Sequence, residues 1–304
     1  MSSRPAPVPP PGTIPTASRA ASALRVAGYD LSVAVLSRFR LDGGAMFGAV
    51  PKALWDRYQE ADARNRIGLV ARVLVLRRDA TCAIVDAGLG EKFGPQEIER
   101  FAVAPVPEAE LPFRWEELTD VVLTHLHFDH AGGVSVWEKP SAREGASRIA
   151  RLRAPQARVV LGQENWDLAQ APGPRERASY LPENVQPLAT GRLDLVCGAG
   201  EVLPGVRVHP SRGHTRGMQW VTVGEGRGTV AFPADLVPTA SHLHLPFAMG
   251  YDMCVEVLLR EKEAFLRQAV EEEWTVVFAH DESIAAARVV EEAGRFALGE
   301  IVEI

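Results

Sequence analysis

The segment that most constrains this chain is Thr-His-Leu-His-Phe-Asp-His at positions 124–130, which directly follows the apolar run 121–123. The run predicts a buried strand, and side chains two apart near a strand end point to the same side. His125 and His127 are therefore expected to lie together, with Asp129 and His130 on the turn that follows. Imidazole and carboxylate groups are the ligands that zinc and related divalent ions prefer. The pattern predicts a metal site at a strand end.

Three polar residues further along the chain also follow predicted strands. His214 comes after a strand predicted at 206–210, Asp235 after one at 229–232, and His280 after one at 275–279. In layered α/β folds, functional groups gather where strands end. Each of these residues alone is more often a capping or core residue, but together with the 124–130 segment they predict one composite metal site.

The remaining periodicity predicts strands that alternate with helices in both halves of the chain. Apolar and β-branched runs predict strands at 29–41, 67–76, 81–86, 121–124, 159–161, 206–210, 220–223, 229–232 and 275–279. Apolar residues at three- and four-residue spacings predict helices at 163–169, 255–270 and 284–293. This order of elements predicts an α/β or α+β fold with a mixed sheet.

Composition excludes several classes of protein. With 46% hydrophobic and 24% charged residues among 304, the chain has the composition of a globular protein. No apolar run reaches the roughly 18 residues that a membrane span needs. The net charge of -6 gives no electrostatic reason to expect a nucleic-acid partner. The three cysteines lie far apart without a Cys-x-x-Cys pair, which predicts no disulfide framework and favours a cytoplasmic location.

The chain is predicted to comprise one catalytic domain behind a tail. Residues 1–22 are rich in proline, which prevents a regular helix or sheet and predicts a disordered tail. Residues 23–304 contain every candidate ligand. Because dividing that stretch would separate residues that must converge on one site, we expect it to fold as a single domain.

The His-x-His-x-Asp-His segment, a later Gly-His-Thr, an aspartate after a strand and a final histidine together resemble the metallo-β-lactamase-fold hydrolases. The resemblance covers about 24–304 and implies an α+β fold, an αβ/βα four-layer sandwich with two divalent metal ions between its sheets. The residue roles that it implies are His125, His127 and His214 as ligands of one ion, Asp129, His130 and His280 as ligands of the second, Asp235 as the bridge, and Asp86 as a hydrogen-bond acceptor that orients a ligand imidazole. Zinc is the expected ion, with iron, manganese and cobalt as alternatives.

Departures from the family pattern narrow the resemblance to one branch. The commonest zinc β-lactamases carry cysteine where this chain has Asp235, and flavodiiron oxygen reductases carry glutamate where it has His127. The stretches 43–52 and 235–252 are similar to the quorum-quenching (YtnP-like) N-acyl-homoserine lactonases and the related methyl parathion hydrolases. Many homoserine-lactone lactonases have a tyrosine three residues after the bridging aspartate, and Pro238 takes that position here.

The resemblance implies hydrolysis of a small uncharged ester or lactone by a hydroxide shared between the two ions, with Asp129 holding or accepting a proton. No Gly-x-Ser-x-Gly motif is present, so a serine hydrolase is not supported. The alternatives are an organophosphate triester hydrolase, a glyoxalase II-like thioester hydrolase, and a non-enzymatic relative in which the metals are structural or serve a sensor. A homodimer is expected because dimers are common among the relatives.

Four residues are candidates for the substrate pocket. Met46 and Phe47 could line an apolar mouth, although packing against the sheet would explain them equally well. His244 lies near the bridging aspartate in sequence, and Tyr251 could replace the hydroxyl that is missing at Pro238.

Overall fold

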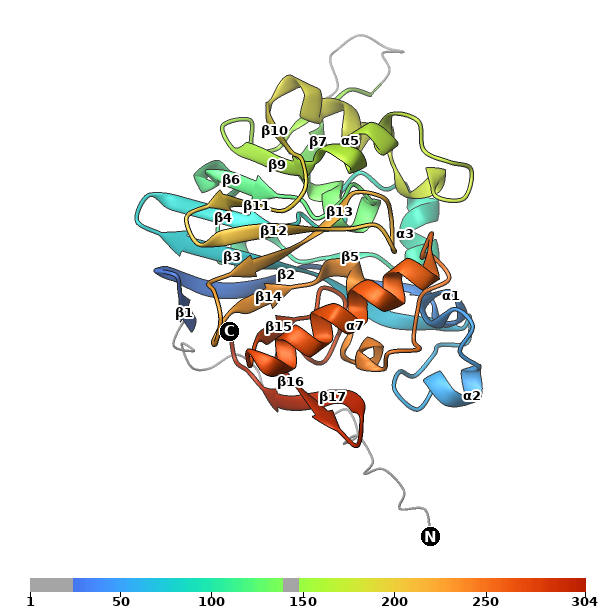
Figure 1. The fold of residues 1–304 in the computed structure, drawn as a ribbon. Helices are drawn as coiled ribbons and strands as arrows, with labels where there is room; N and C mark the ends of the chain where they lie inside the picture. The colour runs from blue at the N-terminus through green and yellow to red at the C-terminus, as the bar shows by residue number, and fades with distance from the viewer. Residues whose placement is uncertain (1–23, 139–147) are drawn as a thin grey trace.

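The computed structural model describes residues 24–138 and 148–304 (Figure 1). The expected tail at 1–22 lies outside these residues. The first sheet has the order β1-β2-β3-β4-β6-β9-β10, and β5 pairs with β2. Its strands are β1 (Leu24–Val26), β2 (Tyr29–Asp42), β3 (Arg66–Arg78), β4 (Thr81–Val85), β5 (Ala104–Pro105), β6 (Asp120–Val122), β9 (Arg158–Gly162) and β10 (Arg192–Val196).

The second sheet has the order β11-β12-β13-β14-β15-β16-β17 and is antiparallel except for the pair β14 and β15. Its strands are β11 (Gly200–Leu203), β12 (Val206–Ser211), β13 (Met218–Val223), β14 (Val230–Phe232), β15 (Thr275–Val277), β16 (Ala286–Glu292) and β17 (Arg295–Ile301). A separate hairpin joins β7 (Ser135–Trp137) to β8 (Ala150–Leu152).

Helices lie outside the two sheets, and α7 crosses the second sheet (Figure 1). The helices are α1 (Gly43–Phe47), α2 (Lys52–Trp55), α3 (Pro95–Phe101), α4 (Phe128–Ala131), α5 (Gln163–Gln170), α6 (Pro182–Val185) and α7 (Val255–Glu271). Within the described parts of the chain, no helix has both the length and the apolar character that crossing a membrane requires.

The first sheet is buried on both faces because the side chains of its strands alternate between two apolar clusters. On β3, Leu74 and Leu76 join the cluster between the sheets, whereas Val73 and Val75 join the cluster beneath the outer helices. Strands buried on both faces read as continuous apolar runs. This explains why the sequence marks β3, β4 and β9 so clearly.

Backbone hydrogen bonds join the two sheets at one end. The amides of Val70 and Arg72 on β3 donate to the carbonyls of His280 and Ala279, directly after β15. The amide of Gln219 on β13 donates to the carbonyl of Thr124, directly after β6. The ends of β6 and β15 are therefore held against the opposite sheet.

The expected α+β sandwich is confirmed, and each predicted strand has a counterpart in the structure. The helices predicted at 163–169 and 255–270 correspond to α5 and α7. The helix predicted at 284–293 is wrong, since this stretch forms β16 in a hairpin with β17. Ala293 and Gly294 at the turn both have positive φ, as a tight hairpin requires. An Ala-Gly pair is a weak turn signal, so the apolar spacing alone suggested a helix.

Lys262 on α7 fixes part of the loop between β14 and α7. Its side chain is completely buried, and its ammonium donates to the carbonyls of His242, His244 and Phe247 at 3.1, 3.2 and 2.5 Å. Burial lowers the pKa of Lys262 to about 7. The lysine therefore holds the 242–247 loop on α7.

The depressed pKa of Lys262 predicts a pH-dependent stability. In the unfolded chain the pKa returns to its ordinary value near 10.5, so the unfolded chain binds more protons than the folded protein between about pH 7 and pH 10. The contribution of this group to the free energy of unfolding therefore rises with pH across that window. In urea denaturation at pH 7, 8 and 9, Lys262→Met should show a smaller rise than the wild type. Identical pH dependences would contradict the depressed pKa.

Candidate metal centre

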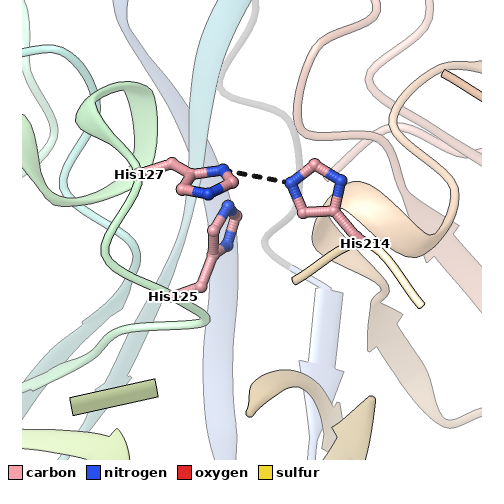
Figure 2. Close-up of side chains that lie close together, drawn as sticks. All are labelled: His125, His127 and His214. Atoms are coloured by element: carbon pink, nitrogen blue, oxygen red, sulfur yellow. Dashed lines mark hydrogen bonds between the residues drawn. The ribbon is translucent and has the colours of Figure 1, made fainter. Parts of the chain in front are cut away.

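All seven candidate ligands converge at the end where the two sheets are joined. They form three overlapping groups, and within each group one potential ligand atom per residue lies within 4.8 Å of the others. The groups are His125, His127 and His214; His125, His130 and Asp235; and Asp129, His130 and His280. Figure 2 shows the first group, whose three rings point toward one another from both halves of the chain.

Strand ends deliver these side chains. His125 and His127 follow β6, and α4 begins directly after His127 and carries Asp129 and His130. His214 lies between β12 and β13, and His280 follows β15. Asp235 lies in a short 3-10 helix (Ala234–Leu236) after β14.

A close approach of two loops fixes the start of this arrangement. A Cβ atom on Gly132, directly after α4, would lie 1.9 Å from the carbonyl oxygen of Leu89, so only glycine fits there. The amide of Ala87 donates to the carbonyl of His130 at 2.7 Å. The turn after β4, which carries Asp86, is therefore pressed against the ligand loop.

In the three-histidine group, ring nitrogens approach one another without an intervening hydrogen-bond acceptor. His127 Nδ1 and His214 Nε2 lie 3.1 Å apart (Figure 2). His125 Nε2 is buried and has no hydrogen-bond partner among the described residues. A buried polar atom without a partner is costly. Three imidazoles with nitrogens facing a common point are the donor set that a divalent ion satisfies.

In the second group, ring nitrogens also approach one another closely. His130 Nε2 and His280 Nε2 lie 3.0 Å apart. Asp129 Oδ2 lies 3.9 Å from His130 Nε2 and 3.7 Å from His280 Nε2. Two imidazoles and a carboxylate therefore face one another here.

Asp235 lies between the two groups and turns one oxygen toward each. Its Oδ2 is 3.1 Å from His214 Nε2 in the first group. Its Oδ1 is 3.3 Å from His130 Nε2 and 3.0 Å from His280 Nε2 in the second. A carboxylate in this position can serve both groups at once.

Asp86 orients two of the imidazoles. Its Oδ2 accepts a hydrogen bond from His130 Nδ1 at 2.7 Å, and it also accepts one from the Thr124 hydroxyl at 3.0 Å. Thr124 Oγ1 in turn lies 3.1 Å from His125 Nδ1. Because the carboxylate can only accept, His130 carries its proton on Nδ1 and its Nε2 is free to face the site.

Hydrogen bonds at Nδ1 also orient the rings of His214 and His280. His214 Nδ1 donates to Asp252 Oδ1 at 2.9 Å, and Asp252 Oδ2 accepts the Met249 amide at 2.7 Å. His280 Nδ1 donates to the carbonyl of Val70 at 2.9 Å. Both rings therefore turn Nε2 toward the centre.

The pKa values follow the charges around each ring. Burial, together with the neighbouring imidazoles, lowers the pKa of His125 and His127 well below the usual value. Burial also opposes the charged form of His130, but the carboxylates of Asp235, Asp86 and Asp129 raise its pKa well above the usual value. Neighbouring histidines hold the pKa of Asp235 well below its ordinary value despite its burial. Buried carboxylates and closely spaced nitrogens together fit positively charged ions, so the donor set suits the expected pair of divalent ions.

Met46 and Phe47 offer almost no surface to a substrate, which supports core packing, the alternative explanation for both. Both are buried in the apolar cluster around α1. Phe47 stacks between Trp55, at 5.3 Å, and His242, at 5.2 Å between ring centroids. Packing therefore accounts for both residues.

His244 and Tyr251 differ in what surrounds them. His244 is partly buried, and its ring lies against Tyr58 and Phe247 with centroids 5.1 Å away in each case. Tyr251 is 38% exposed. Partial burial, with the nearby carboxylate of Asp129, raises the pKa of Tyr251 to about 12. Tyr251 is therefore the more exposed of these two pocket candidates.

Sequence reasoning assigned no role to Asp252, although it is fully enclosed and bound to His214. It belongs to the stretch 235–252, which drew attention as a whole. No signal near Asp252 in the sequence identifies this role, because its partner His214 lies 38 residues away.

Comparison with known proteins agrees with this geometry. Curated relatives include an N-acyl homoserine lactonase of Bacillus cereus, 26% identical over 174 residues, or 56% of this chain and 58% of the relative. They also include the acyl-coenzyme A thioesterase MBLAC2 of Gallus gallus, 26% identical over 205 residues, or 66% of this chain and 68% of the relative. The chain thus spans less than two thirds of the length of the lactonase.

Solved structures share the fold over almost the whole chain. A probable metal-dependent hydrolase from Staphylococcus aureus superposes with a TM-score of 0.77 at 26% identity, covering 91% of this chain and 99% of that one. The dizinc quorum-quenching lactonase AidC has a TM-score of 0.69 at 15% identity, covering 92% of this chain and 97% of that one, and shows the fold alone.

The family model described as the Metallo-beta-lactamase superfamily matches residues 67–280, which begins on β3 and ends on the last candidate ligand. This range contains the backbone hydrogen bonds that join the two sheets, and it contains all seven converging side chains. The chain belongs to the metallo-β-lactamase superfamily.

Proposed function

We propose that this protein is a hydrolase that uses two divalent ions, with zinc as the expected metal, to open lactones or other carboxylic esters. The observation that carries the proposal is the position of Asp235, whose two oxygens face two separate groups of histidines. A single-ion site would need no carboxylate in that position. Two ions at a shared carboxylate are a recurrent arrangement in hydrolytic enzymes.

The side chains of this protein would hold the two ions from opposite sheets. His125, His127 and His214 would bind the first ion, and Asp129, His130 and His280 the second, with Asp235 shared between them. Divalent ions bound in this way lower the pKa of water and polarise a carbonyl group. Asp86 and Asp252 would keep the imidazoles turned toward the ions.

We assign proton transfer to Asp129. Its side chain is 11% exposed, against 1 to 7% for His130, His214, His280 and Asp235. A carboxylate at the solvent side of the centre can accept a proton from the attacking water and return it to the leaving alkoxide.

We assign Tyr251 as a hydrogen-bond donor to the substrate. Its pKa is raised to about 12, so the phenol keeps its proton at neutral pH and can donate to a substrate oxygen. The amide of the preceding residue, Gly250, donates to the Ala45 carbonyl at 2.7 Å, and the following residue, Asp252, is fixed by His214. Tyr251 is therefore held between two anchored neighbours, and we assign it the hydroxyl role that Pro238 cannot fill.

The lactone assignment rests on the sequence resemblance and on the similarity to the Bacillus cereus lactonase. The similarity to an acyl-coenzyme A thioesterase supports thioester hydrolysis as the second candidate. Cys197 and Cys254 are exposed free thiols, which suits the proposed cytoplasmic location. The homodimer remains an expectation from the resemblance.

Removal of the metal should abolish hydrolysis. We expect incubation with a strong chelator to eliminate lactone hydrolysis and added Zn²⁺ to restore it. His127→Ala should lower kcat/KM by more than about 100-fold, because loss of a ligand costs more than the 10- to 100-fold typical of a residue that only supports one. His209→Ala is the matched control, since His209 stacks on Trp220 away from the centre. Full activity in the chelated protein would refute metal-dependent catalysis.

Loss of Asp252 should weaken metal binding through His214. Without its acceptor, the His214 ring is free to turn, so Asp252→Ala should lower Zn²⁺ affinity by about 10- to 100-fold in competition with a chromophoric chelator. Asp120→Ala, which removes a buried carboxylate paired with Arg158 at the start of β6, controls for general destabilisation. Equal Zn²⁺ affinity in the two variants would count against the assignment.

Tyr251 and the substrate class can be tested together. Values of kcat/KM for N-acyl-homoserine lactones, simple lactones, aryl esters, acyl thioesters and phosphotriesters should be highest for a lactone. On that substrate, Tyr251→Phe should lower kcat by about 100-fold with little change in KM, because the donor acts on charge that develops in the transition state. Tyr58→Phe, an equally exposed phenol, should leave both unchanged. A phosphotriester or thioester preference would replace the lactone proposal.

A further inference from the structure

A buried amide joins the two loops that provide the three-histidine group. Asn165 on α5 is fully enclosed. Its Oδ1 accepts the amide of Leu126, between His125 and His127, at 2.9 Å. Its Nδ2 donates to the carbonyl of Arg216, two residues after His214, at 3.0 Å. One side chain therefore ties both ligand loops to α5.

The Asn165 amide begins a chain of hydrogen bonds in which the donor and the acceptor of every bond are fixed. Asn165 Nδ2 donates to Tyr180 Oη at 2.9 Å, and Tyr180 lies 2.8 Å from Thr215 Oγ1. Thr215 donates to Glu176 Oε2 at 2.8 Å. The amide nitrogen can only donate and the carboxylate can only accept. Tyr180 therefore donates to Thr215, and each hydroxyl is used once as a donor and once as an acceptor.

This chain of hydrogen bonds reaches two of the three histidines. The ring of Tyr180 packs edge-on against His127, with centroids 4.9 Å apart at 76°. Thr215 directly follows His214 in the chain. The hydrogen-bond network is therefore joined to His127 by a ring contact and to His214 through the backbone.

The backbone is closely packed where α5 meets the turn after His214. Gly217 has a φ of 78°, and a Cβ atom there would lie 2.3 Å from the backbone nitrogen of Asn165. The start of α5 is thus in direct contact with the turn that follows His214, and a side chain at Gly217 would force the two apart.

We propose that Asn165, with Tyr180, Thr215 and Glu176, is a positioning unit that sets the distance between His214 and the pair His125 and His127. The unit sets the affinity of the three-histidine position for its divalent ion. We expect a smaller effect on the other position, because His130 and His280 are oriented by Asp86 and the Val70 carbonyl instead. The inference rests on the proposed function, since it assumes that these histidines bind an ion.

The experiment titrates metal-free protein with Zn²⁺ alone against a competing chromophoric chelator. A His280→Ala background removes a ligand of the second position, so that the tightest remaining binding reports the three-histidine position. In that background, Asn165→Ala should weaken Zn²⁺ binding by about 10- to 100-fold. Tyr180→Phe, which keeps the ring on His127 but breaks the chain, should weaken it by a smaller factor.

Cobalt provides a readout that a merely structural role would not change. Visible absorption of the Co²⁺-loaded protein depends on ligand geometry, so we expect its bands to shift in Asn165→Ala and Tyr180→Phe. Asn184→Ala is the matched control, since Asn184 is equally buried but its amide has no hydrogen-bond partner among the described residues. It should leave both the Zn²⁺ affinity and the Co²⁺ spectrum unchanged.

The outcomes separate this inference from the proposed function. If Asn165→Ala and Tyr180→Phe keep wild-type Zn²⁺ affinity and Co²⁺ spectra while the free energy of unfolding falls, the unit is only structural and the inference is wrong. If the unmodified protein binds fewer than two Zn²⁺ ions, the two-ion proposal fails instead. Because Tyr180→Phe retains the buried ring, it tests the inference even where Asn165→Ala does not fold.

Discussion

The joint between the two sheets is the constraint on which the rest of the structure depends. β3 donates backbone hydrogen bonds to the segment after β15, and β13 donates one to the segment after β6. A strand end is ordinarily free to relax, but these ends are paired across the sandwich. The residues directly beyond them are His125 and His280, which are therefore placed by main-chain hydrogen bonds that no single side chain has to provide.

That joint concentrates charge and polar atoms where burial makes them costly. Carboxylates and imidazoles of the centre lie within about 4 Å of one another and are nearly inaccessible. Without an ion, the imidazole nitrogens face each other and His125 Nε2 has no partner among the described residues. Such an arrangement destabilises the folded state unless cations offset it. The buried carboxylates and closely spaced nitrogens that are unfavourable for folding also suit the site to divalent ions.

Neighbouring residues in the sequence were sufficient to predict the candidate ligands that follow strands. An apolar run followed by His125 or Asp235 can be read from neighbouring residues, because a strand end brings the next side chain to the sheet edge. Asp252 and Asn165 could not be found in this way, since their partners lie 38 and 39 residues away and nothing near them in sequence marks the contact. The sequence left Phe47 open for a related reason: an apolar side chain near a site can line a pocket or fill the core, and only packing distinguishes the two.

The imidazoles of the centre are restrained by hydrogen bonds and packing, which bears on how it discriminates substrates. His127, His214 and His130 are held from behind by Tyr180, Asp252 and Asp86. Rings restrained in this way keep their geometry when a substrate approaches, which lowers the reorganisation cost of reaction. Asp129 and Tyr251 are more exposed than the histidines of the centre, and the proposed function assigns them to the substrate. Changes in the substrate class within this framework should therefore arise from the loop around Tyr251 and leave the ligand set intact.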